Sequence, residues 1–443
     1  MFSLHQPGGL PHRPAMSKEI SSVIAALAND AQLWSDFLAL CDCGGRQAGS
    51  PGEQRAQELA LSRLAAMDKS ACLKPVSYAG WRYSEAVLTC MAPVADKPLA
   101  CNPLLGAQST PSEGVTAEVI DLGRGTLEQF EQNARDIAGR YVLVRHEYPF
   151  ATDHVHRRRK YNWAMERGAA GYIIANPFPA AGPVAGSSGR GGKAGIPAVG
   201  TDYESAARLA AHGTERARVC LRLSGEDYPA ETSVVLLEVA GSTPASVVLS
   251  AHLDGHSLAE SAMDNASGVA VVLAVARAIA PLVARCRYGL KVCLFSAEEW
   301  ALAGSRQYLD RMSATERAAL MLNINLDTVG GDTELTALTS EFPRLDSFVQ
   351  QAAKQSGITL NTHQPLMQNS DHYNFACHGI PALRLVAGFN RPQCNIRHIL
   401  TGADTRDRVA PTELANAARF TATLLWQALN ADDAVIAGLR LKQ

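Results

Sequence analysis

Short apolar runs alternate with segments of helical periodicity throughout the second half of the chain. The runs are rich in Val, Ile and Leu, which is typical of buried strands. Between them, apolar residues recur every three to four positions, which predicts helices with at least one buried face. We expect strands at residues 233–239, 246–250, 290–296, 321–326 and 382–386, and helices at residues 268–283, 303–312, 342–355 and 412–429.

This alternation of strands and helices predicts the fold class. Strands that are apolar on both faces and are connected by helices form sheets that are covered on both faces. We therefore expect an α/β protein with a mixed, mostly parallel central sheet and helices on both faces. In such sheets ligands bind at the carboxyl ends of the strands, so the residues that follow each strand are the candidates for a functional site.

The first half of the chain shows two different patterns of apolar and polar residues. Residues 17–64 show helical periodicity, and the pattern at residues 76–92 favours strands. From about residue 110, short apolar strands alternate with turn-rich segments, which predicts a smaller α+β or β-rich unit. We predict that residues 17–109 and 231–443 form one domain, and that residues 110–230 form a second domain inserted into it.

The composition narrows the classes of partner. The chain has 443 residues and a formal net charge of −2, so its overall charge favours neither nucleic acid nor an anionic membrane as a partner. The ten cysteines form no CxxC pair with metal-binding spacing, and we expect free thiols, several of them buried. No apolar run has the length of a spanning helix, and the N-terminal segment lacks the features of a signal peptide. We therefore expect a cytoplasmic protein, with export left open.

Histidine and acidic residues gather after the predicted strands. The strand at residues 246–250 is followed by His252 and Asp254, and Asp264 lies just before the long helix at residues 268–283. The ends of the other strands are followed by the pair Glu298-Glu299, by Asp327 and, after a longer loop, by His398.

A crevice lined by four carboxylates calls for positive charge. Asp264, Glu298, Glu299 and Asp327 would repel one another unless they shared protons or bound cations, and carboxylate with imidazole suits zinc. One carboxylate of the adjacent glutamates could bind a metal while the other acts as a general base. Taken singly, each residue has a simpler explanation, such as a helix cap for Asp264. Their occurrence at successive strand ends favours the functional interpretation.

These residues lie within a set of motifs that resembles the M28 family of cocatalytic zinc peptidases. The motifs keep the order of the family from residue 233 to the C-terminus, and residues 46–50 resemble the loop that opens this fold. The matching segments are residues 251–254, 262–270, 295–300, 304–305, 325–327, 370–372, 379–381, 397–398 and 404–407, together with Phe375.

The resemblance implies a site for two Zn²⁺ ions per chain. Asp264 would bridge the two metals. His252 and Asp327 would hold one of them, and Glu299 and His398 would hold the other.

The resemblance also implies roles around the metals. Glu298 would be the general base and proton shuttle for a water molecule shared by the two ions. Asp254 would orient the first zinc-binding histidine, and Asp404 or Asp407 would orient the second. His372 would lie near the site without binding metal.

The middle of the chain resembles a protease-associated (PA) domain. The matching segments are residues 139–144, 168–174 and 195–199. In M28 enzymes such a domain is inserted in the catalytic domain and covers the substrate cleft. The basic run at residues 157–160 lies here, and we expect it to form a solvated helix face, with a role toward acidic substrates as the alternative.

The resemblance implies a dizinc exopeptidase that acts on peptides. An aminopeptidase is the first interpretation, because one metal could hold the free α-amine of the substrate. A carboxypeptidase or dipeptidase shares the same metal core and stays open. A glutaminyl cyclase works with one zinc, and a catalytically silent binding protein built on the PA domain would not need the complete ligand set, so both are less favoured.

Overall fold

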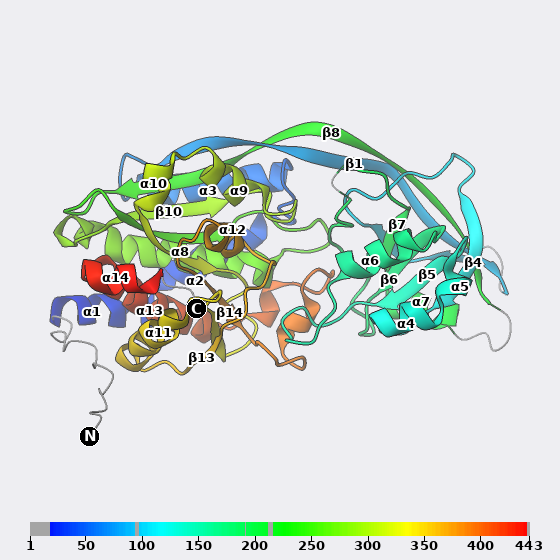
Figure 1. Cartoon of the computed structure of the whole chain (residues 1–443). Helices are drawn as coiled ribbons and strands as arrows, with labels where there is room; N and C mark the ends of the chain where they lie inside the picture. The colour runs from blue at the N-terminus through cyan, green and yellow to red at the C-terminus, as the bar shows by residue number, and fades with distance from the viewer. Residues whose placement is uncertain (1–17, 94–96, 191, 211–215, 441–443) are drawn as a thin grey trace, which may run out of the picture.

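Two hydrophobic cores joined by a pair of long strands make up the protein (Figure 1). The computed structural model describes residues 18–93, 97–190, 192–210 and 216–440. The antiparallel strands β1 (Cys72–Ala92) and β8 (Arg218–Val239) run side by side from the larger body into the smaller one. Through β8, one continuous sheet connects the two bodies.

The larger body contains a mixed sheet whose middle strands are parallel. Its strand order is β13-β12-β14-β11-β9-β10-β8, with β14, β11, β9 and β10 running parallel. Antiparallel pairs flank these strands, β12 with β14 and β8 with β10. The predicted α/β class is confirmed. The strands are β9 (Ser246–His252), β10 (Gly289–Phe295), β11 (Leu320–Leu326), β12 (Leu335–Leu338), β13 (Leu360–His363) and β14 (Ala382–Ala387).

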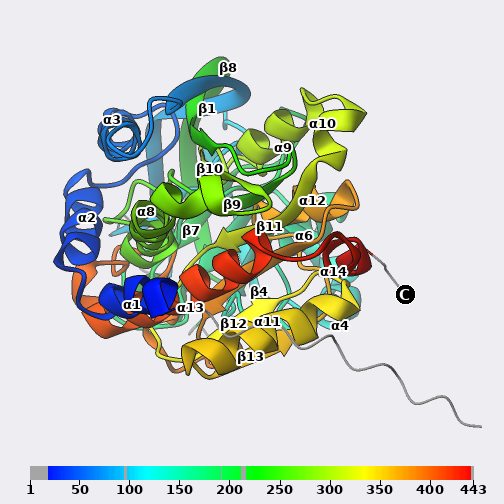
Figure 2. The same cartoon turned by 90° about the vertical axis from the view of Figure 1, so that its left-hand side faces the viewer.

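Helices cover both faces of this sheet (Figure 2). On one face α8 packs with α2 and α13, and on the other α9 packs with α12. The helices of the larger body are α1 (Lys18–Ala26), α2 (Ala31–Asp42), α3 (Pro51–Ala65), α8 (Ser267–Ile279), α9 (Ala303–Asp310), α10 (Ala314–Ala318), α11 (Pro343–Ser356), α12 (His372–Cys377), α13 (Pro411–Leu429) and α14 (Asp433–Leu439).

The segment Ala262–Arg285, which includes α8, is long and apolar enough to cross a membrane by length and composition alone. The sequence analysis expected no such segment. Its most apolar window is 78% buried in the fold, and α8 lies between the strands β9 and β11 and the helices α2 and α13. Burial in the core accounts for its apolar character.

The smaller body is built around short parallel strands. β4, β5, β6 and β7 are parallel neighbours, and β3 pairs antiparallel with β7. Its core includes Trp81, Leu88 and Leu104, which precede the predicted boundary at residue 110, because β1 extends into it. Its remaining elements are β2 (Lys97–Leu99), β3 (Cys101–Pro103), β4 (Val115–Asp121), β5 (Tyr141–Arg145), β6 (Gly171–Ala175), β7 (Ala198–Thr201), α4 (Leu127–Gln132), α5 (Ala134–Ile137), α6 (Arg157–Glu166) and α7 (Tyr203–Ala210).

Candidate metal and catalytic site

The carboxyl ends of β9, β10 and β11 meet at one edge of the sheet. The parallel pairing of β10 with β9 sets Phe295 beside His252, and β11 pairs with β9 in the same direction. His252 ends β9, while Glu298 and Glu299 follow β10 and Asp327 follows β11. The strand register thus brings together residues that lie far apart in the sequence.

His252 lies at the centre of this group. Its Nε2 atom is 3.1 Å from Oδ1 of Asp264 and 3.4 Å from Oδ1 of Asp327. One ligand atom from each of His252, Glu298 and Asp327 lies within 4.8 Å of the others, and all three residues are buried. Imidazole and carboxylate donors at this spacing could share one divalent cation.

The ring of His252 is oriented by a backbone oxygen. Its Nδ1 atom is 3.1 Å from the carbonyl oxygen of Asp254 and 3.8 Å from the nearer oxygen of the Asp254 carboxylate. Because a carbonyl oxygen only accepts hydrogen bonds, Nδ1 carries a proton, and the lone pair of the neutral ring is on Nε2. That lone pair faces Asp264 and Asp327, as a metal ligand requires. The sequence analysis expected Asp254 to orient this ring, and the backbone carbonyl of Asp254 is the nearer acceptor.

Asp264 is held in place by Asp404. The Asp404 carboxylate accepts hydrogen bonds from the backbone N–H of Asp264 (3.3 Å) and of the preceding residue (2.7 Å). The start of α8 is capped by Asn265, whose Oδ1 accepts from the N–H of Gly268 at 2.9 Å. The helix-cap explanation therefore applies to Asn265, and the side chain of Asp264 is free to face His252.

The electrostatics of the group favour a bound cation. Burial raises the pKa of Glu298 well above its usual range, and burial with the nearby charge of Asp264 raises the pKa of Glu299 to about 8. Burial opposes protonation of His252, but the carboxylates of Glu298 and Asp327 raise its pKa well above the usual value. Without a metal, the cluster therefore takes up protons to offset its negative charge.

Asp327 has a second cationic neighbour in Arg384. Nη2 of Arg384 lies 3.0 Å from Oδ1 of Asp327, and both side chains are buried. Burial opposes ionisation of Asp327, yet Arg384 and His252 hold its pKa well below the usual range. The Arg384 guanidinium also stacks over the ring of Phe150, with 4.5 Å to the centroid, so the smaller body contributes to this contact. Asp327 is therefore an anion at neutral pH, and it lies next to the ring of His252.

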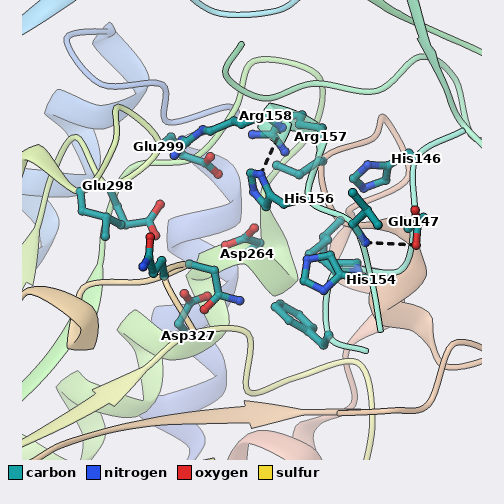
Figure 3. Close-up of a pocket in the computed structure, with 18 of the residues that line it drawn as sticks. His146, Glu147, His154, His156, Arg157, Arg158, Asp264, Glu298, Glu299 and Asp327 are labelled. Carbon is teal, nitrogen blue, oxygen red and sulfur yellow. Dashed lines mark hydrogen bonds between the residues drawn. The ribbon is translucent and has the colours of Figure 1, made fainter. Parts of the chain in front are cut away.

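A cavity of about 780 Å³, including solvent at its mouth, separates the two bodies at this site. Figure 3 shows the carboxylates of the larger body facing basic side chains of the smaller body across it. The carboxylates are Asp264, Glu298, Glu299 and Asp327, and the basic residues are His146, His154, His156, Arg157 and Arg158.

Each of the two bodies contains a segment that matches a known protein family. Residues 234–425 match peptidase family M28, and residues 106–209 match the PA domain. The larger body is an M28 peptidase domain. The PA domain is inserted in it, as predicted, and β1 and β8 are the strands that connect the two.

Relatives of this M28 protein carry two kinds of exopeptidase name. Aminopeptidase YwaD of Bacillus subtilis is 25% identical over 311 residues, which cover 66% of this chain and 65% of that protein. Carboxypeptidase Q of Bos taurus is 27% identical over 299 residues, which cover 64% of this chain and 62% of that protein. The matched part thus spans a little under two thirds of the length of these relatives.

A zinc aminopeptidase structure from Bacillus subtilis shares the fold across both domains. Its TM-score is 0.69, and the alignment covers 96% of this chain and 97% of that chain at 22% identity. The arrangement of M28 and PA domains described above is therefore one that a solved structure also adopts.

The ring of His398 has no carboxylate within ion-pair distance in the described part of the chain, unlike the ring of His252. Its neighbours Ile399 and Leu400 line the cavity, and its Nε2 atom accepts a hydrogen bond from Nε of Arg397 at 3.2 Å. Its ring lies against Phe178 of the PA domain, with 6.1 Å between centroids, and its buried Nδ1 atom has no hydrogen-bond partner. Burial and the nearby Arg408 lower its pKa to about 4, so it is a neutral imidazole at neutral pH.

The residues expected to orient His398 have other contacts. Asp404 binds the backbone at Asp264, as described above. Asp407 accepts a hydrogen bond from the hydroxyl of Thr405 at 2.5 Å. His372 is buried at the start of α12, and neither of its ring nitrogens has a hydrogen-bond partner in the described part of the protein.

The basic run of the PA domain is not the solvated helix face that we expected. Arg157 and Lys160 are buried, Arg158 is half-buried, and only Arg159 is exposed. Lys160 donates hydrogen bonds to Glu147 and to two backbone carbonyls. The run contains a charged residue at nearly every position, so its burial pattern could not be read from periodicity.

Sequence reasoning missed three further kinds of site residue. Arg384 interrupts an apolar strand, and a lone charge in a buried run was a usable signal of a partner. The guanidinium of Arg46 donates hydrogen bonds to the carbonyls of Leu253, Glu260 and Ser261, which tie the N-terminal loop to the loops of the site. The histidines of residues 146–156 carried no signal, because their position over the site depends on how the two domains pack.

Proposed function

We propose that this protein is a zinc-dependent exopeptidase that removes N-terminal residues from peptides. The observation that carries the proposal is the convergence of His252, Asp264 and Asp327 beside the buried carboxylate of Glu298. The match to peptidase family M28 supports peptide-bond hydrolysis. The names of aminopeptidase YwaD and of the Bacillus subtilis zinc aminopeptidase support the metal and the direction of cleavage.

The donor set fits a zinc ion. His252 presents the lone pair of Nε2 between two carboxylates, and the buried acidic groups need a counter-charge. His252, Asp264 and Asp327 would hold the ion. Bound there, zinc would polarise the peptide carbonyl and lower the pKa of a water molecule.

Glu298 is the proton carrier of this proposal. It follows β10 and lines the cavity, where it can accept a proton from the attacking water and return it to the leaving amine. Its position is set by Asp254, whose carboxylate accepts its backbone N–H at 3.0 Å. Burial raises its pKa, so in the free protein it binds a proton readily, and a nearby cation would bring that pKa down toward the working range of a base.

A second zinc ion is the less supported part of the proposal. It would share Asp264 and be held by Glu299 and His398, as the resemblance implies. The neutral His398 with its unpaired Nδ1 has the chemistry of a ligand, but its Nε2 accepts a hydrogen bond from Arg397 and no carboxylate lies within ion-pair distance of its ring among the described residues. We therefore expect one zinc to bind tightly and a second to bind more weakly.

A carboxypeptidase or dipeptidase is the second candidate function. It is favoured by the two arginines that line the cavity opposite the carboxylates, since a free carboxylate of the substrate could bind there. Carboxypeptidase Q is also among the relatives.

Peptides with free or blocked termini distinguish these candidates. An aminopeptidase will not cleave a peptide whose N-terminus is acetylated and will tolerate a C-terminal amide. Cleavage of acetylated peptides together with loss of cleavage on amidation would assign a carboxypeptidase instead. No cleavage of any peptide by the zinc-loaded protein would overturn the exopeptidase proposal.

A further inference from the structure

Two arginines of the PA domain, the buried Arg157 and the half-buried Arg158, form no ion pair in the described part of the chain. Arg157 and Arg158 begin helix α6 and line the cavity on the side opposite the M28 carboxylates (Figure 3). Neither guanidinium has a carboxylate within ion-pair distance in the described part of the chain. Buried charges in proteins are normally paired, so these two require an explanation.

Arg157 is fixed in position and forms no ion pair, although the charges of Glu298 and Glu299 act on it across the cavity. It is only 6% exposed, and its Nε donates a hydrogen bond to the carbonyl of Ser187 at 2.9 Å. A side chain at Gly186 would collide with its guanidinium, so this glycine leaves the space that the arginine fills. Burial lowers its pKa to about 10, so it remains a cation at neutral pH.

Arg158 has an unsatisfied donor. Its Nε atom is buried and has no hydrogen-bond partner. Its side chain packs over Gly189, where a Cβ atom would come within 2.9 Å of it. The glycine-rich loop after β6 thus makes room for both arginines.

Two other cations of the same region are paired. Lys160 contacts the carboxylate of Glu147 at 2.5 Å, and Arg124 contacts the same carboxylate at 2.7 Å. Pairing is therefore available in this region, yet neither arginine that lines the cavity forms an ion pair in the described part of the chain.

The start of α6 adds to the positive potential at this point. The helix has 10 residues, and its N-terminal end carries the positive end of the helix dipole. The Nε2 atoms of His146 and His154, which also line the cavity, are buried without partners. Helix end, guanidinium groups and imidazoles together form a site of the kind that binds an anion.

We propose that Arg157 and Arg158 bind a carboxylate of the substrate and so select short or acidic peptides. The inference rests on the proposed exopeptidase function and adds the substrate class. The carboxylate lies on the side of the cavity opposite the catalytic group, so the peptide spans the space between the M28 and PA domains. Guanidinium groups are suited to this role because they hold a carboxylate through paired hydrogen bonds.

The carboxylate can come from two parts of a peptide. In a dipeptide it is the free C-terminus, one residue beyond the scissile bond. In a longer peptide it is the side chain of Asp or Glu next to that bond. The recognition chemistry is the same, and the substrates below separate the two sources.

Steady-state kinetics with two matched substrate pairs test the proposal. Ala-Ala is compared with Ala-Ala amide, and Ala-Asp amide with Ala-Asn amide, using the zinc-loaded full-length protein. We expect kcat/KM to be at least tenfold higher for the carboxylate member of at least one pair, and the pair that shows it identifies the source. Equal values within both pairs would overturn the proposal.

Substitutions of the arginines test whether these residues cause the preference for carboxylate substrates. Arg158→Gln should abolish the preference by raising KM for the carboxylate substrate at least tenfold, with little change for its neutral partner, and Arg158→Lys should restore part of it. Arg159→Gln is the matched control, because Arg159 is the exposed neighbour on the same helix and does not line the cavity. A preference of unchanged size in Arg158→Gln would overturn the proposal.

A binding measurement separates this inference from the proposed function. In the zinc-loaded Glu298→Gln variant, calorimetry should show at least tenfold tighter binding of Ala-Ala than of Ala-Ala amide, or of Ala-Asp amide than of Ala-Asn amide. Selective binding without hydrolysis by the unmutated protein would overturn the exopeptidase proposal and keep the carboxylate site. Hydrolysis by the unmutated protein without selective binding by the variant would overturn the carboxylate site and keep the exopeptidase proposal.

Discussion

The carboxylate of Asp254 accepts hydrogen bonds from the backbone N–H groups of both Glu298 and Glu299, at 3.0 Å and 3.2 Å. Asp254, which follows β9, thereby fixes the loop after β10, and its own carbonyl oxygen orients His252. The carboxylate of Asp404 likewise accepts hydrogen bonds from the backbone N–H groups of Met263 and Asp264. Two buried aspartates thus set the positions of the acidic residues around the site through hydrogen bonds with the backbone.

Asp254→Asn tests this positioning. The amide group would turn a donor toward one of the two backbone N–H groups, which leaves a buried donor unpaired at a cost of about 1–3 kcal/mol. Displacement of Glu298 should lower kcat by roughly 10–100-fold, the usual scale for residues that orient ligands. Unfolding by urea and steady-state kinetics measure the two effects. Asp310→Asn, which changes an exposed aspartate at the end of α9, should change neither, and wild-type kinetics in Asp254→Asn would contradict the assigned role.

His398→Ala tests the second metal. If one zinc is held by His252, Asp264 and Asp327, the variant should retain about one equivalent of zinc and lose only the weaker second one. His252→Ala should lose the tight ion, because it removes the central nitrogen donor of the group. Metal analysis after dialysis against buffers of decreasing zinc concentration provides the comparison. Two tightly bound equivalents in His398→Ala would show that this histidine is not a ligand.

Glu53 predicts a pH dependence of stability. Burial, together with the charge of Asp254, raises the pKa of Glu53 to about 7, and one of its carboxylate oxygens has no partner. The folded chain therefore keeps this proton to a higher pH than the unfolded chain does. The stability that the protonated group contributes is complete below about pH 4.5, falls as the pH rises toward 7, and is absent above it.

Glu53→Gln removes that dependence. Its stability relative to the unmutated protein should increase between pH 5 and pH 7 by on the order of 2–3 kcal/mol and then stay constant. Urea unfolding across this range measures the difference. Glu58→Gln, which changes an exposed carboxylate on the same helix, should show a constant difference. A constant difference for Glu53→Gln as well would mean that Glu53 ionises normally in the folded protein.

The strand ends of the M28 domain could be predicted because each carries its own local signal. An apolar run identifies β9, β10 and β11, and the polar residue that follows each run marks its end, so the grouping of His252, Glu298 and Asp327 follows from parallel pairing. The short strands β12 and β13 were missed because four residues are too few to show a period. Residues 233–239 looked like a separate strand, since the sequence does not show that β8 begins at Arg218.

The side of the cavity that the PA domain forms could not be predicted, because its position depends on packing between the two domains. Arg157 lies over carboxylates that are more than a hundred positions later in the chain, and nothing near it in the sequence indicates that contact. The burial of Arg157 and Lys160 was missed for another reason, because a run with a charge at every position shows no period. Arg384 is the intermediate case, where a single charge within an apolar strand gave a signal but not the identity of its partner Asp327.

The Glu298→Gln variant tests the central claim most directly. It keeps the shape of the side chain and removes the proton acceptor, while His252, Asp264 and Asp327 are untouched. Zinc content and peptide hydrolysis are measured on the same preparation. The account predicts unchanged tight zinc binding with a loss of kcat of about 10²–10⁴-fold. Hydrolysis at the unmutated rate with zinc bound would contradict it.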